Sequence, residues 1–376
     1  MQRNNAIDSV KGFAILLVML GHCIVLNGLD KTDPYVYDMI KSVQMPLFML
    51  VSGVLSSMGV RNNGAGTGMK KIGARAVSYL VPFFSWFVLV HVYVHAKAGT
   101  LSAAMFLKEL KELLFQTDRG LWFLMTLFVA TVCVMAAQTV TDRLIKQDKP
   151  GGKAKTQSIK AVVFVSVSLC LYLFFFLQSR SGNTLLSPSL TVQYFPFYLL
   201  GYIANGYGEN LCCVIFSSQK IREKLQKIQP FVVALLTVLF VAMVIGMDLT
   251  APVDGVKTLA MQMAASLFGT IACYVIVYRM AQWHQKKTEK RGFLSFIGIY
   301  TLEIYVLHFR FARLLGISEK GLQFYTVEGI AWVALAFAVM SALTAICIMI
   351  LRRIPVVSLL LFGKKHVPVL RANRQS

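Results

Sequence analysis

Long apolar runs alternate with short polar connections over almost the whole chain. A helix needs roughly 17–25 predominantly apolar residues to cross about 30 Å of hydrocarbon. About ten runs approach or meet that length, so the pattern predicts an all-α, polytopic transmembrane helix bundle. The expected spans are 13–29, 39–58, 76–95, 121–140, 159–178, 190–206, 230–247, 257–279, 295–312 and 329–351. They form one membrane domain, residues 1–376, with a basic tail at 352–376.

Composition supports this interpretation and removes one alternative. Hydrophobic residues make up 56% of the chain and charged residues 15%, whereas soluble domains average about 45–50% and 25%. The net charge of +21 would suit a nucleic-acid-binding protein, but the apolar content argues against it. We therefore expect a lipid bilayer, and no nucleic acid, as a partner.

The basic residues also predict the orientation of the bundle. With a cytoplasmic N-terminus, the inner segments hold 27 Lys and Arg residues and the outer loops hold 11. Cytoplasmic loops carry such an excess. Both termini are therefore expected on the cytoplasmic side of a plasma or inner membrane. Most of these charges need no ligand.

Three polar residues of the first span share one helical face. Asp8 and Lys11 form an i, i+3 pair at the cytoplasmic entrance, and His22 lies roughly 16 Å further in. Gly12 and Gly21 flank this face and allow close helix packing. Ionisable groups inside a membrane are functional candidates. The alternative is structural: Asp8 caps the helix, Lys11 anchors it and His22 hydrogen-bonds to another helix.

Two further pairs lie at helical spacing. Glu303 and Arg310 are seven residues apart, which favours an ion pair within the membrane. His91 and His95 have the i, i+4 spacing of metal ligands, but no carboxylate accompanies them on their span, so no metal site is predicted.

Short motifs extend this picture over most of the chain. They are 7–15 continuing to Gly21-His22, 44–53, Lys70-Lys71 with Arg75 and Pro82-Phe83, 121–124, 197–202 and 298–308. Each is weak alone, but together, in this order, they resemble the membrane-bound acyltransferase 3 family, and most closely fucose 4-O-acetylases and related polysaccharide O-acetyltransferases.

The resemblance implies an O-acyltransferase that moves an acetyl group from acetyl-CoA, as donor substrate, to a carbohydrate hydroxyl. A surface polysaccharide or a lipid-linked sugar precursor is the expected acceptor. Imidazole commonly moves protons in such reactions, so His22 is expected to be the general base or a transient acyl carrier. Asp8 and Lys11 would complete the catalytic set by organising the cytoplasmic mouth.

The expected donor site contains Lys70, Lys71 and Arg75, whose charges suit the phosphates of acyl-CoA. Their alternative role is to anchor the span at its cytoplasmic end. The chain departs from the family at two positions, because Lys11 replaces the usual Arg and Ser78 stands where many members carry a second Arg.

The expected acceptor site contains Trp122, Glu303, Tyr305 and His308. Two of these residues also have a structural alternative. Trp122 suits the aromatic belt at the membrane surface, and Glu303 suits a structural ion pair. His308 matches the closing family motif.

Two other functions fit a helix bundle. A transporter or exporter of a polysaccharide or small solute would use similar buried charges, although no inverted repeat is evident. A structural membrane subunit would leave Asp8, Lys11 and His22 aligned by chance. The sequence leaves open acetyl against succinyl transfer, direct transfer against an acyl-enzyme, the side on which transfer ends, and a monomer against a homodimer.

Overall fold

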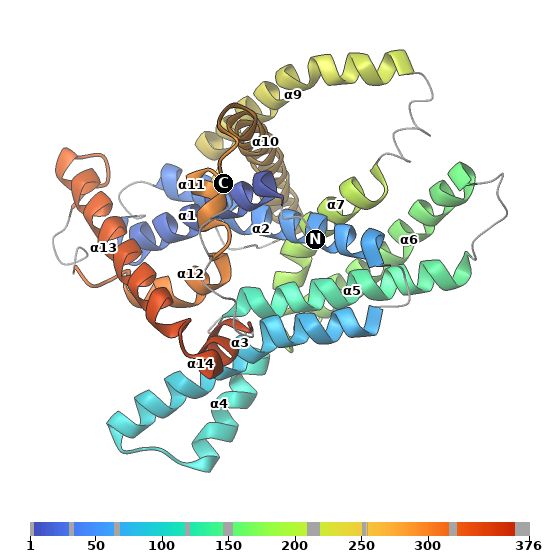
Figure 1. Ribbon diagram of the computed structural model, residues 1–376. Helices are drawn as coiled ribbons and strands as arrows, with labels where there is room; N and C mark the ends of the chain where they lie inside the picture. The colour runs from blue at the N-terminus through green and yellow to red at the C-terminus, as the bar shows by residue number, and fades with distance from the viewer. Residues whose placement is uncertain are drawn as a thin grey trace, which may run out of the picture.

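The computed structural model describes residues 4–29, 34–63, 68–116, 121–145, 153–208, 219–249, 253, 255–315 and 322–364. Within these ranges the regular structure is helical, without strands. Figure 1 shows α1 and α2 in the middle, with α13 on one side and α6 on the other. The elements are α1 (Asn5–Val25), α2 (Pro34–Asn63), α3 (Gly68–Ala98), α4 (Ala103–Phe115), α5 (Trp122–Leu144), α6 (Lys153–Arg180), α7 (Pro188–Gly206), α9 (Gln219–Gly246), α10 (Val256–Thr288), α11 (Phe293–Ile297), α12 (Thr301–Leu307), the 3₁₀ helix η4 (His308–Arg310), α13 (Val327–Leu351) and α14 (Pro355–Phe362).

Eight of the described helices are long and apolar enough to cross a membrane, which confirms the predicted transmembrane bundle. They are α1, α2, α3, α5, α6, α9, α10 and α13. Only 17% of the apolar window of α6 and 11% of that of α9 is buried. Side chains such as Leu177 on α6 and Phe231 on α9 are exposed. Apolar faces of this kind suit contact with lipid.

Two of the ten expected spans differ from this group. The range 190–206 does form a helix, α7, but its aromatic side chains Phe195, Phe197 and Tyr198 are buried inside the bundle. The range 295–312 is not one helix, because it divides into α11, α12 and η4. The prediction of a continuous ninth span is therefore wrong.

The divided segment packs against α1 through two glycines. A Cβ atom at Gly12 would overlap the carbonyl oxygen of Leu294, and one at Gly298 would overlap that of Asp8. The backbones of α1 and of the turn after α11 therefore approach each other more closely than any larger residue permits. The expectation that Gly12 allows close packing is confirmed.

A second glycine pair joins α2 to α7, the most extensively packed helix pair in the described chain. A Cβ at Gly53 would overlap the carbonyl oxygen of Tyr198, and one at Gly201 that of Leu50. Near this contact Asn205 donates a hydrogen bond of 2.7 Å to the Ser57 hydroxyl. Small residues thus fix both central helix crossings.

The chain after α13 returns to the bundle. α14 packs against α3 and contacts α12, and the Nζ atom of Lys364 lies 2.8 Å from the Oε1 atom of Glu303. Arg352 Nε lies 3.7 Å from the same oxygen. The basic tail expected from residue 352 therefore contains a packed part through residue 364, and residues 365–376 lie outside the described chain.

We expect Gly12→Ala to lower the stability of the protein, because the added methyl group must push α1 away from Leu294. Overpacking of this kind costs about 1–3 kcal/mol. Thermal unfolding of detergent-purified protein measures the change. Gly246→Ala is the matched control, since nothing lies within 4 Å of its added Cβ. Equal melting temperatures for the two variants would contradict the close approach at Gly12.

The Glu303–Lys364 ion pair predicts non-additive effects of mutation. Glu303 is fully buried, so Lys364→Met removes a partner from a buried carboxylate and destabilises the protein. In Glu303→Gln/Lys364→Met both charges are gone, and we expect a coupling energy of about 0.5–3 kcal/mol. Unfolding in mixed detergent micelles measures it, with the exposed Lys97→Met as control. Strictly additive losses would contradict the pair.

Candidate active site

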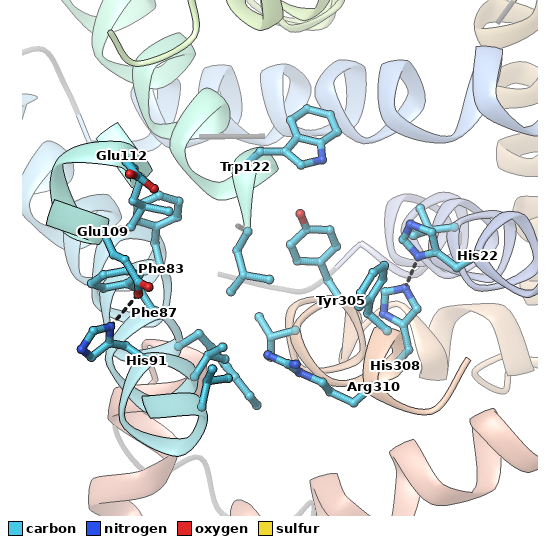
Figure 2. A pocket seen from close by; sticks show the side chains of 18 of the residues that line it. His22, Phe83, Phe87, His91, Glu109, Glu112, Trp122, Tyr305, His308 and Arg310 are labelled. Atoms are coloured by element: carbon cyan, nitrogen blue, oxygen red, sulfur yellow. Dashed lines mark hydrogen bonds and ion pairs between the residues drawn. The ribbon is translucent and has the colours of Figure 1, made fainter. Parts of the chain in front are cut away.

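An open cavity of about 730 Å³ lies at the end of the bundle where α1 and α3 finish and α5 begins. Side chains from α1, α2, α3, α4, α5, α12 and η4 line it. Figure 2 shows His22 and His308 on one wall, His91 and Glu109 on the opposite wall, and Tyr305 between them. The cavity is large enough for a small ligand.

The two histidines of the first wall are in direct contact. His22 Nδ1 lies 2.8 Å from His308 Nε2, and the rings stack with centroids 5.0 Å apart and 18° between their planes. His308 is 1% exposed, whereas His22 is half-buried and lines the cavity. Residues separated by 286 positions thus form one polar group.

A backbone carbonyl determines where the protons of this pair lie. His308 Nδ1 is 2.7 Å from the carbonyl oxygen of Ile304, and a carbonyl can only accept, so Nδ1 carries a hydrogen. In a neutral His308, Nε2 is then an acceptor and His22 Nδ1 must donate to it. A neutral His22 consequently has its lone pair on Nε2, the form required of a general base.

Aromatic rings surround the histidine pair. Phe309 meets the His22 ring edge to face at 5.2 Å. The ring centroids of Tyr305 and Phe123 are 5.7 Å apart, and those of Trp122 and Tyr194 are 5.2 Å apart. Trp122, Tyr305 and His308 all line the cavity, so the structure places three of the four predicted acceptor-site residues in the same cavity as His22.

The fourth of these residues lies elsewhere. Glu303 is fully buried against Lys364 and Arg352 and is not among the cavity-lining residues. The expected Glu303–Arg310 pair is wrong, because α12 ends at Leu307 and the helical spacing of seven residues no longer applies. Arg310 instead lines the cavity.

Asp8 and Lys11 form the predicted pair at the opposite end of α1. Lys11 Nζ lies 2.8 Å from Asp8 Oδ1, and the side chain of Asp8 is buried near the Gly298 contact. Asn4, not Asp8, caps the helix by accepting from the amides of residues 6 and 7. Neither Asp8 nor Lys11 lines the cavity, so the pair belongs with the α1–α11 packing.

The expected donor site is also at that end of the bundle. Arg75 is half-buried and donates a 2.9 Å hydrogen bond to the Tyr79 hydroxyl. Lys70 and Lys71 belong to the first turn of α3, but their side chains lie outside the part of the chain that the structure describes. Eight residues, about 12 Å of helix, separate Arg75 from Phe83, where the lining of the cavity by α3 begins.

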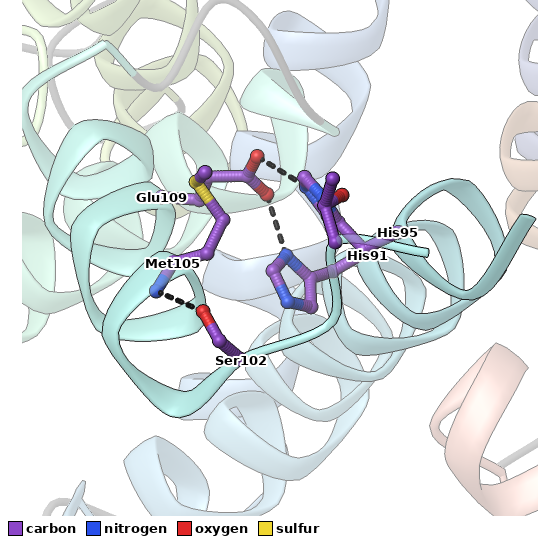
Figure 3. Close-up of polar contacts among 6 residues, drawn as sticks. His91, His95, Ser102, Met105 and Glu109 are labelled. Carbon is purple, nitrogen blue, oxygen red and sulfur yellow. Dashed lines mark hydrogen bonds and ion pairs between the residues drawn. The ribbon is translucent and has the colours of Figure 1, made fainter. Parts of the chain in front are cut away.

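The wall opposite the histidine pair carries a polar cluster that was not predicted from the sequence. Glu109 on α4 contacts His91 Nδ1 at 2.6 Å and His95 Nε2 at 2.7 Å (Figure 3). The hydrogen bond from His91, followed by that from His95, lowers the pKa of the Glu109 carboxyl. The sequence signal that could have revealed Glu109 is the helix cap at Ser102 followed by the amphipathic pattern of α4. This helix is too short and too polar to be predicted as a span.

Comparisons with known proteins identify the family of the chain. A protein-family model described as an acyltransferase domain matches residues 4–352. Nodulation protein NolL of Mesorhizobium japonicum is 26% identical over 212 residues, 54% of this chain and 48% of that protein. Nodulation protein NolL of Sinorhizobium fredii is 32% identical over 139 residues, 34% of this chain and 36% of that protein.

The matched part of the chain thus spans half or less of the length of these relatives. No solved structure matches the chain. The family model nevertheless extends from the cap of α1 to the end of α13. The chain therefore belongs to the acyltransferase 3 family, and eight of its described helices are long and apolar enough to cross a membrane.

Proposed function

We propose that the protein transfers an acetyl group from acetyl-CoA to a carbohydrate hydroxyl at the cavity, in the plasma or inner membrane of its cell. The observation that carries this proposal is the His22–His308 contact. It holds a lone pair on His22 Nε2 in a half-enclosed cavity with aromatic walls. Such a site can accept a hydroxyl proton and bind the apolar face of a sugar.

Direct transfer needs one proton movement in each direction. The acceptor hydroxyl gives its proton to His22 Nε2 while its oxygen forms a bond to the thioester carbonyl carbon. The carbon–sulfur bond then breaks, and the CoA sulfur takes the proton from His22. His308 does not exchange protons in this scheme. It acts as a positioning residue that keeps Nε2 of His22 unprotonated before the attack.

A covalent route uses the same nitrogen. His22 Nε2 attacks the thioester carbonyl carbon, the carbon–sulfur bond breaks and CoA leaves as a thiolate, which takes a proton from water. The acceptor oxygen then attacks the acetyl carbon, the carbon–nitrogen bond to His22 breaks, and the hydroxyl proton is released through Nε2 to water. The two routes differ in kinetics, because an acyl-enzyme gives a ping-pong pattern and releases CoA before the acceptor binds. Both depend on the tautomer that the Ile304 carbonyl selects.

The donor enters from the end of the bundle that carries Arg75. Acyl-CoA is a polyanion, and Arg75 with Lys70 and Lys71 supplies a group of cations in the N-terminal part of α3. The distance of about 12 Å between Arg75 and the cavity suits the extended pantetheine arm, which carries the thioester away from the phosphates. Tyr79 orients the Arg75 guanidinium through its hydroxyl.

The acceptor occupies the side of the cavity formed by Trp122 and Tyr305. Both present aromatic surface to the cavity, and sugars commonly pack their C–H faces on such rings. With the expected orientation, this end of the bundle faces away from the cytoplasm. Donor and acceptor would then reach His22 from opposite sides.

We expect His22→Ala to lower kcat for acetyl transfer by about 10²–10⁴-fold, the usual contribution of a general base. Release of the CoA thiol from acetyl-CoA, with candidate carbohydrate acceptors, measures it. His308→Leu should also lower kcat while leaving the KM for acetyl-CoA little changed. His308→Gln should recover part of the loss, because its amide oxygen can accept from His22 Nδ1.

The control for this series is His284→Asn, on an exposed part of α10. It should keep wild-type activity. Normal turnover in His22→Ala would overturn the catalytic role of His22. A loss in His308→Leu that appears only in KM would overturn the positioning role of His308. Counterflow of a labelled solute in liposomes without CoA release would instead favour a transporter.

We expect Arg75→Ala to raise the KM for acetyl-CoA about tenfold or more, the effect of losing one hydrogen bond to a charged group. The acceptor KM should change less. Lys71→Ala/Arg75→Ala should show a larger donor effect. Arg143→Ala is the matched control, since it removes an exposed arginine at the end of α5. An unchanged donor KM in the double variant would identify these residues as anchors only.

A further inference from the structure

We infer that His91, His95 and Glu109 form a binding site for a divalent transition-metal cation, with Zn²⁺ the best fit to the ligand set. The three side chains each offer a ligand atom, and these atoms lie within 4.8 Å of one another. Two histidines and one carboxylate are a common protein ligand set for zinc. The inference stands on this geometry and does not depend on the proposed acetyl transfer.

The arrangement comes from two helices and a short connection. His91 and His95 are one turn apart on α3, and Glu109 faces them from α4 (Figure 3). His91 is 3% exposed. The side chains of His95 and Glu109 are 12% and 32% exposed. A cation held here would have the buried His91 on one side and the cavity on the other.

Hydrogen bonding favours a ligand role for His95. Its Nδ1 lies 2.7 Å from the Thr100 hydroxyl, and its Nε2 faces Glu109. A metal-binding histidine usually has its second nitrogen fixed by a partner of this kind. When His95 Nδ1 donates to the Thr100 hydroxyl, the lone pair on Nε2 points at the Glu109 carboxylate. A cation bound between Nε2 and the carboxylate oxygen would remove the repulsion between these two electron-rich atoms.

His91 gives a second indication. Its Nδ1 faces Glu109 Oε2 at 2.6 Å, while its buried Nε2 has no hydrogen-bond partner among the described residues. The hydrogen-bonding contact of His91 is therefore on the carboxylate side, where the cation would bind.

The position of the cluster gives the cation a consequence. Because His91, His95 and Glu109 all line the cavity that contains His22, an open coordination position would face the bound ligand. Three protein ligands with one open position are the usual pattern of zinc sites that bind water or substrate. The cation would also link α4 to α3 on that wall of the cavity.

The test uses the full-length protein, purified in detergent with an affinity tag that contains no histidine. After dialysis against a weak chelator, we expect one bound Zn²⁺ per chain by elemental analysis. Stripping with a strong chelator should lower the melting temperature, and added Zn²⁺ should raise it in a concentration-dependent manner. Co²⁺ in the stripped protein should show the absorption of a tetrahedral nitrogen and oxygen site.

Two variants and two controls locate the metal. Glu109→Gln and His95→Asn should lose the bound Zn²⁺ and its effect on the melting temperature. Glu112→Gln, one turn along α4, and His284→Asn, on α10, should keep both. The inference is overturned if wild-type protein neither retains Zn²⁺ nor responds to it, or if the Glu109 and His95 variants retain it. The cluster would then only join α3 to α4 through its hydrogen bonds.

Discussion

Close backbone contact between α1 and the segment after α10 is the constraint on which the active site depends. Gly12 and Gly298 allow this approach, because each replaces a side chain where a carbonyl oxygen of the other segment lies. The contact aligns α12 and η4 beside α1, so His308 reaches His22. Gly12 lies ten residues before His22 on α1, and Gly298 lies ten residues before His308. The contact between these two glycine-containing segments nevertheless sets the distance between the two imidazoles.

The sequence predicts well what a single helix determines and poorly what depends on packing. The Asp8–Lys11 pair follows from i, i+3 spacing and is present. The same spacing argument gave a wrong Glu303–Arg310 pair, because the helix that carries Glu303 ends at Leu307, before Arg310. His22 and His308 were each predicted, one from its place in a span and the other from a motif, but their contact depends on an approach between distant segments.

The histidine pair also shows how a membrane protein can fix the tautomer of a buried imidazole without adding a carboxylate. A carboxylate could fix the tautomer of an imidazole, but an ionised carboxylate inside a membrane costs free energy unless it is paired. Here a backbone carbonyl and a second imidazole do so with neutral groups. The buried carboxylate nearby, Glu303, is instead compensated by Lys364 and Arg352.

Charge is therefore distributed along the bundle by function. The paired ions Asp8–Lys11 and Glu303–Lys364 support packing, and the Arg75 end of α3 suits a polyanionic donor. Around His22 the described groups are neutral rings, with Arg310 and the His91–His95–Glu109 cluster at the walls of the same cavity. In the proposed reaction a proton would therefore move between the acceptor and His22 without competing against a fixed ion pair, and Arg310 would be available to polar groups of the ligand.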